Sequence, residues 1–340
     1  MYKREETINR MNALGGAGEP FFFVISHDLQ HNLLVPAHET VLRPVALVMP
    51  SGSLGAAVDW SSRPERPHDL FFEPCPPSRE RYERAFLNVR EHLVRGDSYL
   101  LNLCMATPVK TNVTLEHVFH EAQAPYRMLL GADPGVPGVH GRACVCFSPE
   151  PFVTMRGRTI ATFPMKGTAP ADTEEARRRL ESDEKESRES ATIVDLMRND
   201  LSMVASGVHV SRYRYMSAVT TRNGPMLQCS SEIRGELPPD WRACVGDILM
   251  ALLPAGSVTG APKQATCKAI AESEEMERGY YTGVFGLFNG RELESAVAIR
   301  FMEQGADGLV YKSGGGITVM SDLDDEYREL KNKVYVPFAF

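Results

Sequence analysis

One lysine stands out among the residues that could do chemistry. Lys166 lies in the run Pro-Met-Lys-Gly-Thr of residues 164–168, between a strand-like segment and an acidic helical segment. A lysine amine flanked by loop-forming residues can act as a nucleophile, or it can bind a phosphate or a carboxylate as a cation. Three further segments, residues 189–200, 254–263 and 314–333, are expected to form walls of the same pocket.

Glutamates one helical turn apart form two candidate cation sites. Glu326 and Glu329 share a helix face through their i,i+3 spacing, and Asp322 or Asp324 can cap the start of that helix. Two carboxylates on one face can hold Mg²⁺, which prefers oxygen ligands. Glu186 and Glu189 have the same spacing. For either pair taken alone, a solvated acidic helical turn is the commoner interpretation.

Two glycine-containing segments could contact an anion. The run Gly314 to Gly316 follows a strand-like segment, and a backbone without Cβ atoms can approach a ligand and direct N–H groups at it. A tight turn is the simpler interpretation of that run. Residues 254–263 read as a loop that ends at a helix start, where free N–H groups could meet an anion. The loop is not a P-loop, because Lys263 follows Gly260 by only three residues.

Polar residues beside the first glutamate pair suggest an internal network. Asp195 stands among Ile, Val and Leu, and Arg198, Asn199 and Asp200 follow it. Such a cluster is typical of buried polar groups that satisfy one another. A structural role and a functional role remain equally open for it.

The elements that must position these residues alternate between strands and helices. The hairpin over residues 152–163 turns at Gly157, and the Lys166 loop is expected at its exit. Residues 1–19 are polar and then Gly-rich, which predicts a loosely held start. Further strands are predicted at residues 21–26, 45–49, 99–103, 143–147, 208–215, 226–233, 283–288, 295–302 and 309–312, and helices at 78–96, 172–203, 247–253, 262–277 and after 321.

A single α+β domain is the predicted organisation, since no internal repeat or low-complexity linker follows residue 80. Residues 1–79 are expected to supply N-terminal strands and a surface connection to that domain. Residues 80–340 are expected to form its catalytic part.

Composition excludes several classes of protein. The 340-residue chain is 43% hydrophobic and has a formal net charge of −7, so it can bury a large core and does not favour nucleic acid or an anionic membrane as a partner. Its seven cysteines are an odd number and no basic-then-apolar leader is seen, which predicts a reducing, cytoplasmic location. No window reaches the roughly 18 apolar residues that span a bilayer.

Seven collinear segments resemble the chorismate-utilising enzymes, which include anthranilate synthase, aminodeoxychorismate synthase component I, isochorismate synthase and salicylate synthase. The resemblance covers roughly residues 80–335. It rests on residues 147–150, 164–168, 189 with 193–201, 254–263, 281–283, 298–300 and 314–333. It implies an α+β fold in which two large antiparallel sheets pack as a sandwich with flanking helices.

The resemblance also implies the binding residues. Mg²⁺ would lie between Glu189 and Glu326 and bind the ring carboxylate of chorismate, with Glu329 as a neighbouring ligand. The backbone of Gly314, Gly315 and Gly316 would meet the ring carboxylate, and Tyr281 with Arg300 the enolpyruvyl carboxylate. The remaining implied substrate-binding residues are Thr259, Gly260 and Lys333.

Lys166 indicates which reaction to expect. Anthranilate synthases and isochorismate synthases look alike in having Ala at this position, whereas aminodeoxychorismate synthases typically carry Lys. The implied reaction is amination at C4: a neutral lysine amine adds to ring C2 while the C4 hydroxyl leaves, and ammonia then enters at C4 and expels the lysine. Glu150 is the implied general acid, which requires a raised pKa.

The chain departs from the family pattern at two positions. Leu100 stands where isochorismate synthases place a water-activating lysine and aminating members usually have Gln, which leaves Asn102 and Thr168 as candidate ammonia contacts. Gln228 stands where most relatives place a histidine, so an imidazole role is in doubt.

The nitrogen source is expected to be free ammonia or a separate glutaminase subunit in a heterodimer, because no cysteine lies in a Gly-x-Cys-x-Gly glutaminase signature. The amino terminus is short for the family, so feedback inhibition by tryptophan is not expected.

The leading hypothesis is conversion of chorismate and ammonia to 4-amino-4-deoxychorismate on the route to 4-aminobenzoate and folate. The first alternative is the anthranilate synthase component I reaction. An alternative of another class is a non-catalytic chorismate-binding regulatory subunit, which predicts decayed acid and metal positions.

Overall fold

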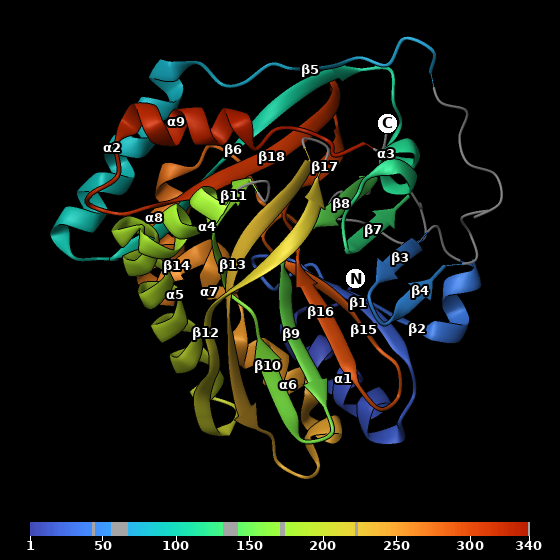
Figure 1. Ribbon diagram of the computed structural model, residues 1–340. Coiled ribbons are helices and arrows are strands. Elements are labelled where there is room, and N and C mark those ends of the chain that lie inside the picture. Colours follow the sequence, from blue (N-terminus) through green and yellow to red (C-terminus); the bar gives the residue numbers. More distant parts are fainter. Residues whose placement is uncertain (43–44, 56–66, 132–141, 171–173, 222–223, 339–340) are drawn as a thin grey trace.

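In the computed structural model, the described residues form two nine-stranded antiparallel sheets with helices packed against them (Figure 1). The structure describes residues 1–42, 45–55, 67–131, 142–170, 174–221 and 224–338. The architecture confirms the α+β fold predicted from the sequence, with two large antiparallel sheets and flanking helices.

The first sheet carries the strand with Lys166. Its order is β11-β13-β10-β9-β16-β15-β1-β2, and β12 pairs with β13 off this path. The strands are β1 (Phe21–Ile25), β2 (Leu33–Pro36), β9 (Pro151–Arg156), β10 (Thr159–Thr162), β11 (Met165–Pro170), β12 (Ser206–Thr221), β13 (Gly224–Glu236), β15 (Val284–Phe288) and β16 (Leu293–Val297).

The second sheet carries the three consecutive glycines. Its order is β14-β6-β18-β17-β8-β7-β3-β4, and β5 pairs with β6 off this path. The strands are β3 (Val45–Met49), β4 (Gly52–Leu54), β5 (Phe72–Pro74), β6 (Leu100–Thr111), β7 (Tyr126–Leu130), β8 (Cys144–Ser148), β14 (Gly260–Ala261), β17 (Phe301–Gly305) and β18 (Gly308–Ile317).

Helices cover the outer faces of the sheets. Figure 1 shows α2, α8 and α9 at the end of the molecule that carries β6 and β18, and α1 and α6 at the opposite end. The helices are α1 (Arg4–Ala17), α2 (Arg79–Arg95), α3 (Leu115–Glu121), α4 (Glu174–Ser182), α5 (Glu184–Ser202), α6 (Val245–Leu252), α7 (Gly256–Thr259), α8 (Lys263–Ser273) and α9 (Leu323–Asn332), with 3-10 turns η1 (Ala37–Leu42) and η3 (Trp241–Cys244).

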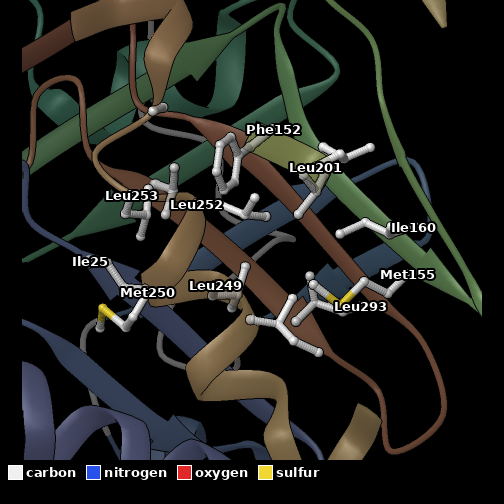
Figure 2. Packing of buried hydrophobic residues seen from close by; sticks show 14 of the residues in the cluster. Ile25, Phe152, Met155, Ile160, Leu201, Leu249, Met250, Leu252, Leu253 and Leu293 are labelled. Carbon is white, nitrogen blue, oxygen red and sulfur yellow. The ribbon is translucent and has the colours of Figure 1, made fainter. Parts of the chain in front are cut away.

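Buried apolar residues fill the space between the first sheet and its helices. Figure 2 shows Phe152, Met155 and Ile160 of the β9–β10 hairpin packed with Leu249 of α6 and Leu201 of α5. A second cluster joins the two sheets, with Phe22 and Phe285 from the first and Met128 and Phe301 from the second. The central strands β1 and β15 of the first sheet are therefore held from both faces by apolar contacts.

The expected loose start is wrong. Residues 4–17 form α1, and a Cβ atom on Gly15 would lie 2.2 Å from the Arg242 carbonyl oxygen and 2.8 Å from Val245 Cγ1. The absence of a side chain at Gly15 thus allows α1 to pack closely against the segment that begins α6. The Gly-rich composition reflects close packing here.

One described stretch passes the length and composition test for a membrane span, in contrast to the sequence-based expectation. Residues 241–259 have a mean hydropathy of 1.2, but most of the stretch is buried within the fold. It is divided into η3, α6 and α7, and Pro254 separates the last two. These short helices belong to the core.

Candidate active site

A cavity of about 530 Å³ brings most of the predicted site residues together. Its walls come from both sheets, with Asn102 of β6 on one side, Met165 of β11 and Gln228 of β13 on another, and α5 and α7 completing the enclosure. The predicted residues that line it are Glu150, Glu189, Gly260, Tyr281, Arg300, Gly314, Gly315, Gly316, Glu329 and Lys333.

The three glycines form part of a strand, so the interpretation as a tight turn is wrong. Gly314 to Gly316 lie in β18 and pair with Cys104 to Asn102 of β6. On the other edge of β18, pairing with β17 begins at Lys312, so in the described part of the chain no strand covers the glycines there. Because successive residues of a strand direct their N–H groups to opposite edges, at most two of the three amides can face the open edge.

Arg300 and Tyr281 form an apolar-walled, cationic corner of the cavity. Tyr281 is 3% exposed, and burial raises the pKa of its phenol well above the ordinary value. Burial opposes the charge on Arg300, yet its pKa is raised, since the phenols of Tyr311 and Tyr335 lie beside it. Among the described residues no carboxylate is within ion-pair distance of Arg300. The corner is thus ready for a carboxylate that the protein does not supply.

The backbone of Arg300 is held in an unusual conformation. Its φ is +53°, in the left-handed region that non-glycine residues seldom adopt. The Phe147 N–H donates to the Arg300 carbonyl oxygen at 3.0 Å, which fixes this turn immediately before β17. Such strain is common where a side chain must be directed into a site.

Glu150 lies between β8 and β9 at the cavity wall. The Ser257 hydroxyl of α7 donates to Glu150 Oε1 at 2.8 Å. This contact orients the carboxyl group toward the cavity that both residues line. An acid in this place can deliver a proton to a leaving group only in a matching substrate pose.

Carboxylates gather at the rim beside the glycine strand. A Cβ atom on Gly315 would lie 3.3 Å from Glu326 Oε2 and 3.5 Å from Glu329 Oε1, so both carboxylates of α9 converge on the space that this glycine leaves open. Lys333 Nζ donates to Glu329 Oε1 at 2.6 Å and to the Gly314 carbonyl oxygen at 2.8 Å. Glu189 of α5 lines the same cavity.

The donor chemistry of this rim fits a hard cation. Three carboxylates around an open space offer the oxygen ligands that Mg²⁺ prefers, with room for water and substrate oxygens. Within the described ranges, however, no three His, Cys, Asp or Glu side chains already form a compact metal-binding group. The arrangement therefore fits a cation that also takes ligands from its substrate.

Lys166 lies in a strand, not in the expected loop. Met165 pairs with Ser230, and Thr168 pairs with Gln228. Two residues of β11, Lys166 and Gly167, therefore lie opposite a single residue of β13, and this β-bulge contains Lys166. Bulges re-aim side chains and are common beside active sites. The side chains of Lys166 and Thr168 lie outside the part of the structure that is described.

Thr259 and Gly260 have different positions relative to the cavity. Gly260 lines it with φ +121°, and a Cβ there would lie 1.8 Å from the Leu100 carbonyl oxygen, so only glycine fits. Thr259 is fully buried behind the lining, and its Oγ1 has no hydrogen-bond partner in the described structure.

The internal polar network predicted around α5 exists only in part. Asp200 is 6% exposed, and Lys263 Nζ contacts its Oδ2 at 3.0 Å, so Lys263 is committed to this pair. The side chains of Asp195 and Arg198 are 83% and 50% exposed, which places them on the solvent face. The pair at Asp200 links α5 to the start of α8.

A buried ion pair behind the cavity was not expected from the sequence. Arg278 contacts Glu274 Oε1 at 2.6 Å and donates to the carbonyl oxygens of Asn102 at 2.6 Å and Val258 at 3.0 Å. Glu274 Oε1 accepts the Cys104 N–H at 2.8 Å. The pair joins β6, α7 and the end of α8. The Glu-x-x-x-Arg spacing was a weak signal, because α8 ends at Ser273.

The fold and the cavity define a class of protein: a two-sheet α+β domain whose cavity combines a cationic corner, a backbone edge and a carboxylate rim, suited to a small substrate with more than one carboxylate. A family model described as chorismate binding enzyme matches residues 7–338. The chain therefore belongs to the chorismate binding enzymes, a family of chorismate-utilising enzymes.

Individual relatives refine this placement. An uncharacterized PabA-like protein of Pasteurella multocida is 45% identical, over 97% of this chain and 98% of its own length. Anthranilate synthase component 1 of Streptomyces coelicolor is 35% identical over 75% of this chain and 49% of its own length. Aminodeoxychorismate synthase component 1 of Klebsiella aerogenes is 32% identical over 76% and 57%. The chain thus spans about half the length of these two named synthases.

A solved structure supports the fold alone. The menaquinone-specific isochorismate synthase of Escherichia coli superposes with a TM-score of 0.72 at 18% identity, covering 98% of this chain and 81% of the other.

Proposed function

We propose that this enzyme aminates chorismate at C4 to give 4-amino-4-deoxychorismate, the aminodeoxychorismate synthase component I reaction. The observation that supports the proposal is that Lys166 follows Met165, a residue that lines the cavity, and lies within the bulge of β11. A lysine at this wall offers a nucleophile that a small residue would not.

Substrate orientation follows from the two ends of the cavity. Arg300, with no carboxylate partner in the described structure, binds the enolpyruvyl carboxylate, and Tyr281 shields that contact from water. The ring carboxylate lies toward Gly315 and the rim of α9. Between them, the ring is placed with C2 toward β11 and its C4 hydroxyl toward Glu150.

The chemical steps balance within this arrangement. The neutral Lys166 amine forms a bond to ring C2, the ring double bond shifts, and the C4–O bond breaks as Glu150 gives its proton to the departing hydroxyl, which leaves as water. Ammonia then forms the C4–N bond, the double bond shifts back and the C2–N bond breaks, with its electron pair returning to Lys166. The proton lost by the incoming nitrogen returns to Glu150.

Mg²⁺ is proposed to bind at the rim formed by Glu189, Glu326 and Glu329. When bound, it would neutralise the ring carboxylate. Lys333 holds Glu329 in place through their 2.6 Å contact and is released when that carboxylate turns to the cation. The ammonia is proposed to come from free ammonium or from a separate glutaminase subunit.

The test is to incubate the purified chain with chorismate, Mg²⁺ and an ammonium salt and to identify the product by mass spectrometry. An aminated product that keeps its pyruvyl group, and that added aminodeoxychorismate lyase converts to 4-aminobenzoate, supports the proposal. Anthranilate as the product contradicts it.

Anthranilate synthesis is the second candidate, because the Streptomyces coelicolor relative carries that name at 35% identity. It requires amination at C2 and loss of pyruvate, so the same incubation distinguishes the two. A chain that binds chorismate but forms no product with ammonium or with any glutaminase would instead favour the non-catalytic alternative.

A further inference from the structure

A second cavity of about 600 Å³ lies against the first. Pro149, Met165 and Gln228 line both cavities, so these three residues form a partition between them. The remaining walls of the second cavity come mainly from β9, β10, β12 and β13 of the first sheet. The partition includes Met165, the residue directly before Lys166, so the second cavity lies behind the wall that β11 contributes to the first.

The second cavity contains a buried carboxylate without a cationic partner. Glu294 is 5% exposed, and its oxygens accept the Ser51 N–H at 3.0 Å and the Tyr126 hydroxyl at 3.5 Å, both neutral donors. Among the described residues, no Lys, Arg or His lies within ion-pair distance of it. A buried carboxylate of this kind attracts a small cation.

A second carboxylate in the same cavity is already paired. Glu232 is 5% exposed, and Arg234 binds its Oε1 at 2.6 Å. Arg156 also lines this cavity, but its side chain is 58% exposed and pairs with Glu292 at 3.6 Å. Among the described lining residues, Glu294 is therefore the carboxylate without a direct cationic partner. Ammonium is such a small cation, and it is the form in which most of the ammonia that the proposed reaction consumes is present at neutral pH.

The partition is made of groups that a small neutral molecule can pass. Gln228 Nε2 contacts the Met165 thioether and lies 3.5 Å from Ser230 Oγ. The unbranched Met165 side chain can change rotamer. The carboxamide of Gln228 carries no charge, and it can accept a hydrogen bond from an N–H group and donate one. Ammonia could therefore be handed across, whereas an ion would lose its hydration without gaining a counter-charge.

We infer that the second cavity is the ammonia-uptake site of this enzyme. Ammonium binds at Glu294, passes its proton to that carboxylate and from there to solvent, and crosses as ammonia between Met165 and Gln228 to reach the substrate. The inference rests on the proposed amination. In this proposal Gln228 binds ammonia as it crosses between the two cavities. Chorismate then enters the first cavity from its open side.

The test compares the Michaelis constants for ammonium and for chorismate. Ser217 lines only the second cavity and pairs across the sheet with Gln228, so Ser217→Trp fills the uptake site. Ser206→Trp, at an exposed position of the same strand, is the matched control. We expect Ser217→Trp to raise the KM for ammonium about tenfold or more with the KM for chorismate within about twofold, and the control to change neither.

A second variant decides the matter if the tryptophan prevents folding. Glu294→Gln keeps the shape and removes the charge: its amide oxygen still accepts the Ser51 N–H, and the Tyr126 hydroxyl can accept from the new amide N–H. Glu236→Gln is its control, at a residue whose side chain is 58% exposed on the same sheet. We expect Glu294→Gln to raise the KM for ammonium selectively. An unchanged KM for ammonium in both Ser217→Trp and Glu294→Gln overturns the inference, as does a parallel rise in the KM for chorismate.

The wild-type measurement separates this inference from the proposed function. If the wild type makes anthranilate, C4 amination fails, but the comparison of the two Michaelis constants still tests ammonia uptake. If the wild type aminates chorismate at C4 while the variants keep a normal KM for ammonium, only the uptake site fails. A wild type that forms no aminated product at any ammonium concentration removes both.

Discussion

Two ion pairs beside the cavity have the same separation and opposite surroundings. Arg278 and Glu274 lie 2.6 Å apart with side chains 3% and 1% exposed. Lys333 and Glu329 also lie 2.6 Å apart, but their side chains are 28% and 52% exposed. The first pair, called the deep pair here, lies behind the cavity wall and holds it through the carbonyl oxygens of Asn102 and Val258, which line the cavity. The second pair lies at the rim.

The difference indicates which part of the site is fixed before substrate arrives. Both side chains of the deep pair are buried, so removing one of them leaves the other charge out of reach of water. The rim pair is screened by solvent, so either partner can exchange its contact for a ligand at little cost. A rigid wall and an exchangeable rim suit a cavity that must hold its shape while it takes up a cation together with its substrate.

The largest expected loss of stability comes from removing one partner of the deep pair. Burial disfavours the Arg278 charge, yet the pKa of Arg278 is raised, since Cys104 and the Glu274 carboxylate lie beside it. Arg278→Met leaves Glu274 buried without its partner, and we expect a loss of about 3–5 kcal/mol in the free energy of unfolding. Chemical denaturation measures this. The double variant Arg278→Met/Glu274→Met should recover part of the loss, and a loss below about 1 kcal/mol in the single variant would show that the wall does not depend on the pair.

Alanine substitutions at two adjacent glycines of β18 should have different effects, because one glycine packs against the sheet backbone and the other faces the rim. A Cβ on Gly314 would lie 2.6 Å from Cys104 Sγ and from the Leu103 carbonyl oxygen, so Gly314→Ala forces the sheet backbone to move and should cost about 1–3 kcal/mol. A Cβ on Gly315 would meet the flexible side-chain ends of Glu326, Glu329 and Lys333, and no backbone atom is among these three nearest neighbours. Gly315→Ala should therefore leave stability within about 0.5 kcal/mol of wild type and weaken Mg²⁺-dependent chorismate binding. Equal losses of stability would contradict the distinction.

The deep wall should also be sensitive to acid. Burial, with a further contribution from the Arg278 charge, lowers the pKa of His27 to about 3, and His27 Nδ1 lies 3.1 Å from Thr282 Oγ1 of the same wall. The unfolded chain binds this proton near pH 6.5 and the folded chain does not, so stability falls as the pH is lowered through that window. Between pH 6.5 and pH 5 we expect a loss of about 2 kcal/mol. His27→Gln should flatten this slope, and an unchanged slope would show that other groups cause it.

The smallest effect on stability should come from the rim. Glu329→Gln should change the free energy of unfolding by less than about 1 kcal/mol, because the pair is partly exposed. The same variant should weaken chorismate binding in the presence of Mg²⁺ about tenfold and leave binding without Mg²⁺ nearly unchanged. Calorimetric titration measures both. Asp325→Asn, exposed on the same helix, is the control and should alter neither.

Local sequence signals predicted some elements well. Ser78 caps α2 by accepting from the Arg81 N–H, and Gly96 ends that helix with φ +84°. The β9–β10 hairpin turns at Gly157 as expected. In these elements the residues that decide the structure are neighbours in the chain, so pattern and turn chemistry suffice.

Elements determined by distant partners could not be predicted in the same way. The Lys166 segment and the three glycines were expected as loop and turn, but β11 is a strand because it pairs with β13, and Gly314 to Gly316 extend because β6 lies beside them. Glycine is needed at position 15 because α1 packs there against the start of α6, more than two hundred residues later in the chain. Of the site, the lining residues were largely anticipated through the family resemblance, whereas the Arg278–Glu274 wall depends on a fold that local spacing does not reveal.

The measurement that tests the central claim most directly is the product assay of Lys166→Ala beside wild type, with chorismate, Mg²⁺ and ammonium and with chorismate binding measured on both proteins. We predict that wild type forms 4-amino-4-deoxychorismate, and that Lys166→Ala binds chorismate but forms that product at least about 100-fold more slowly. Undiminished formation of 4-amino-4-deoxychorismate by Lys166→Ala, or anthranilate from the wild type, would contradict the account.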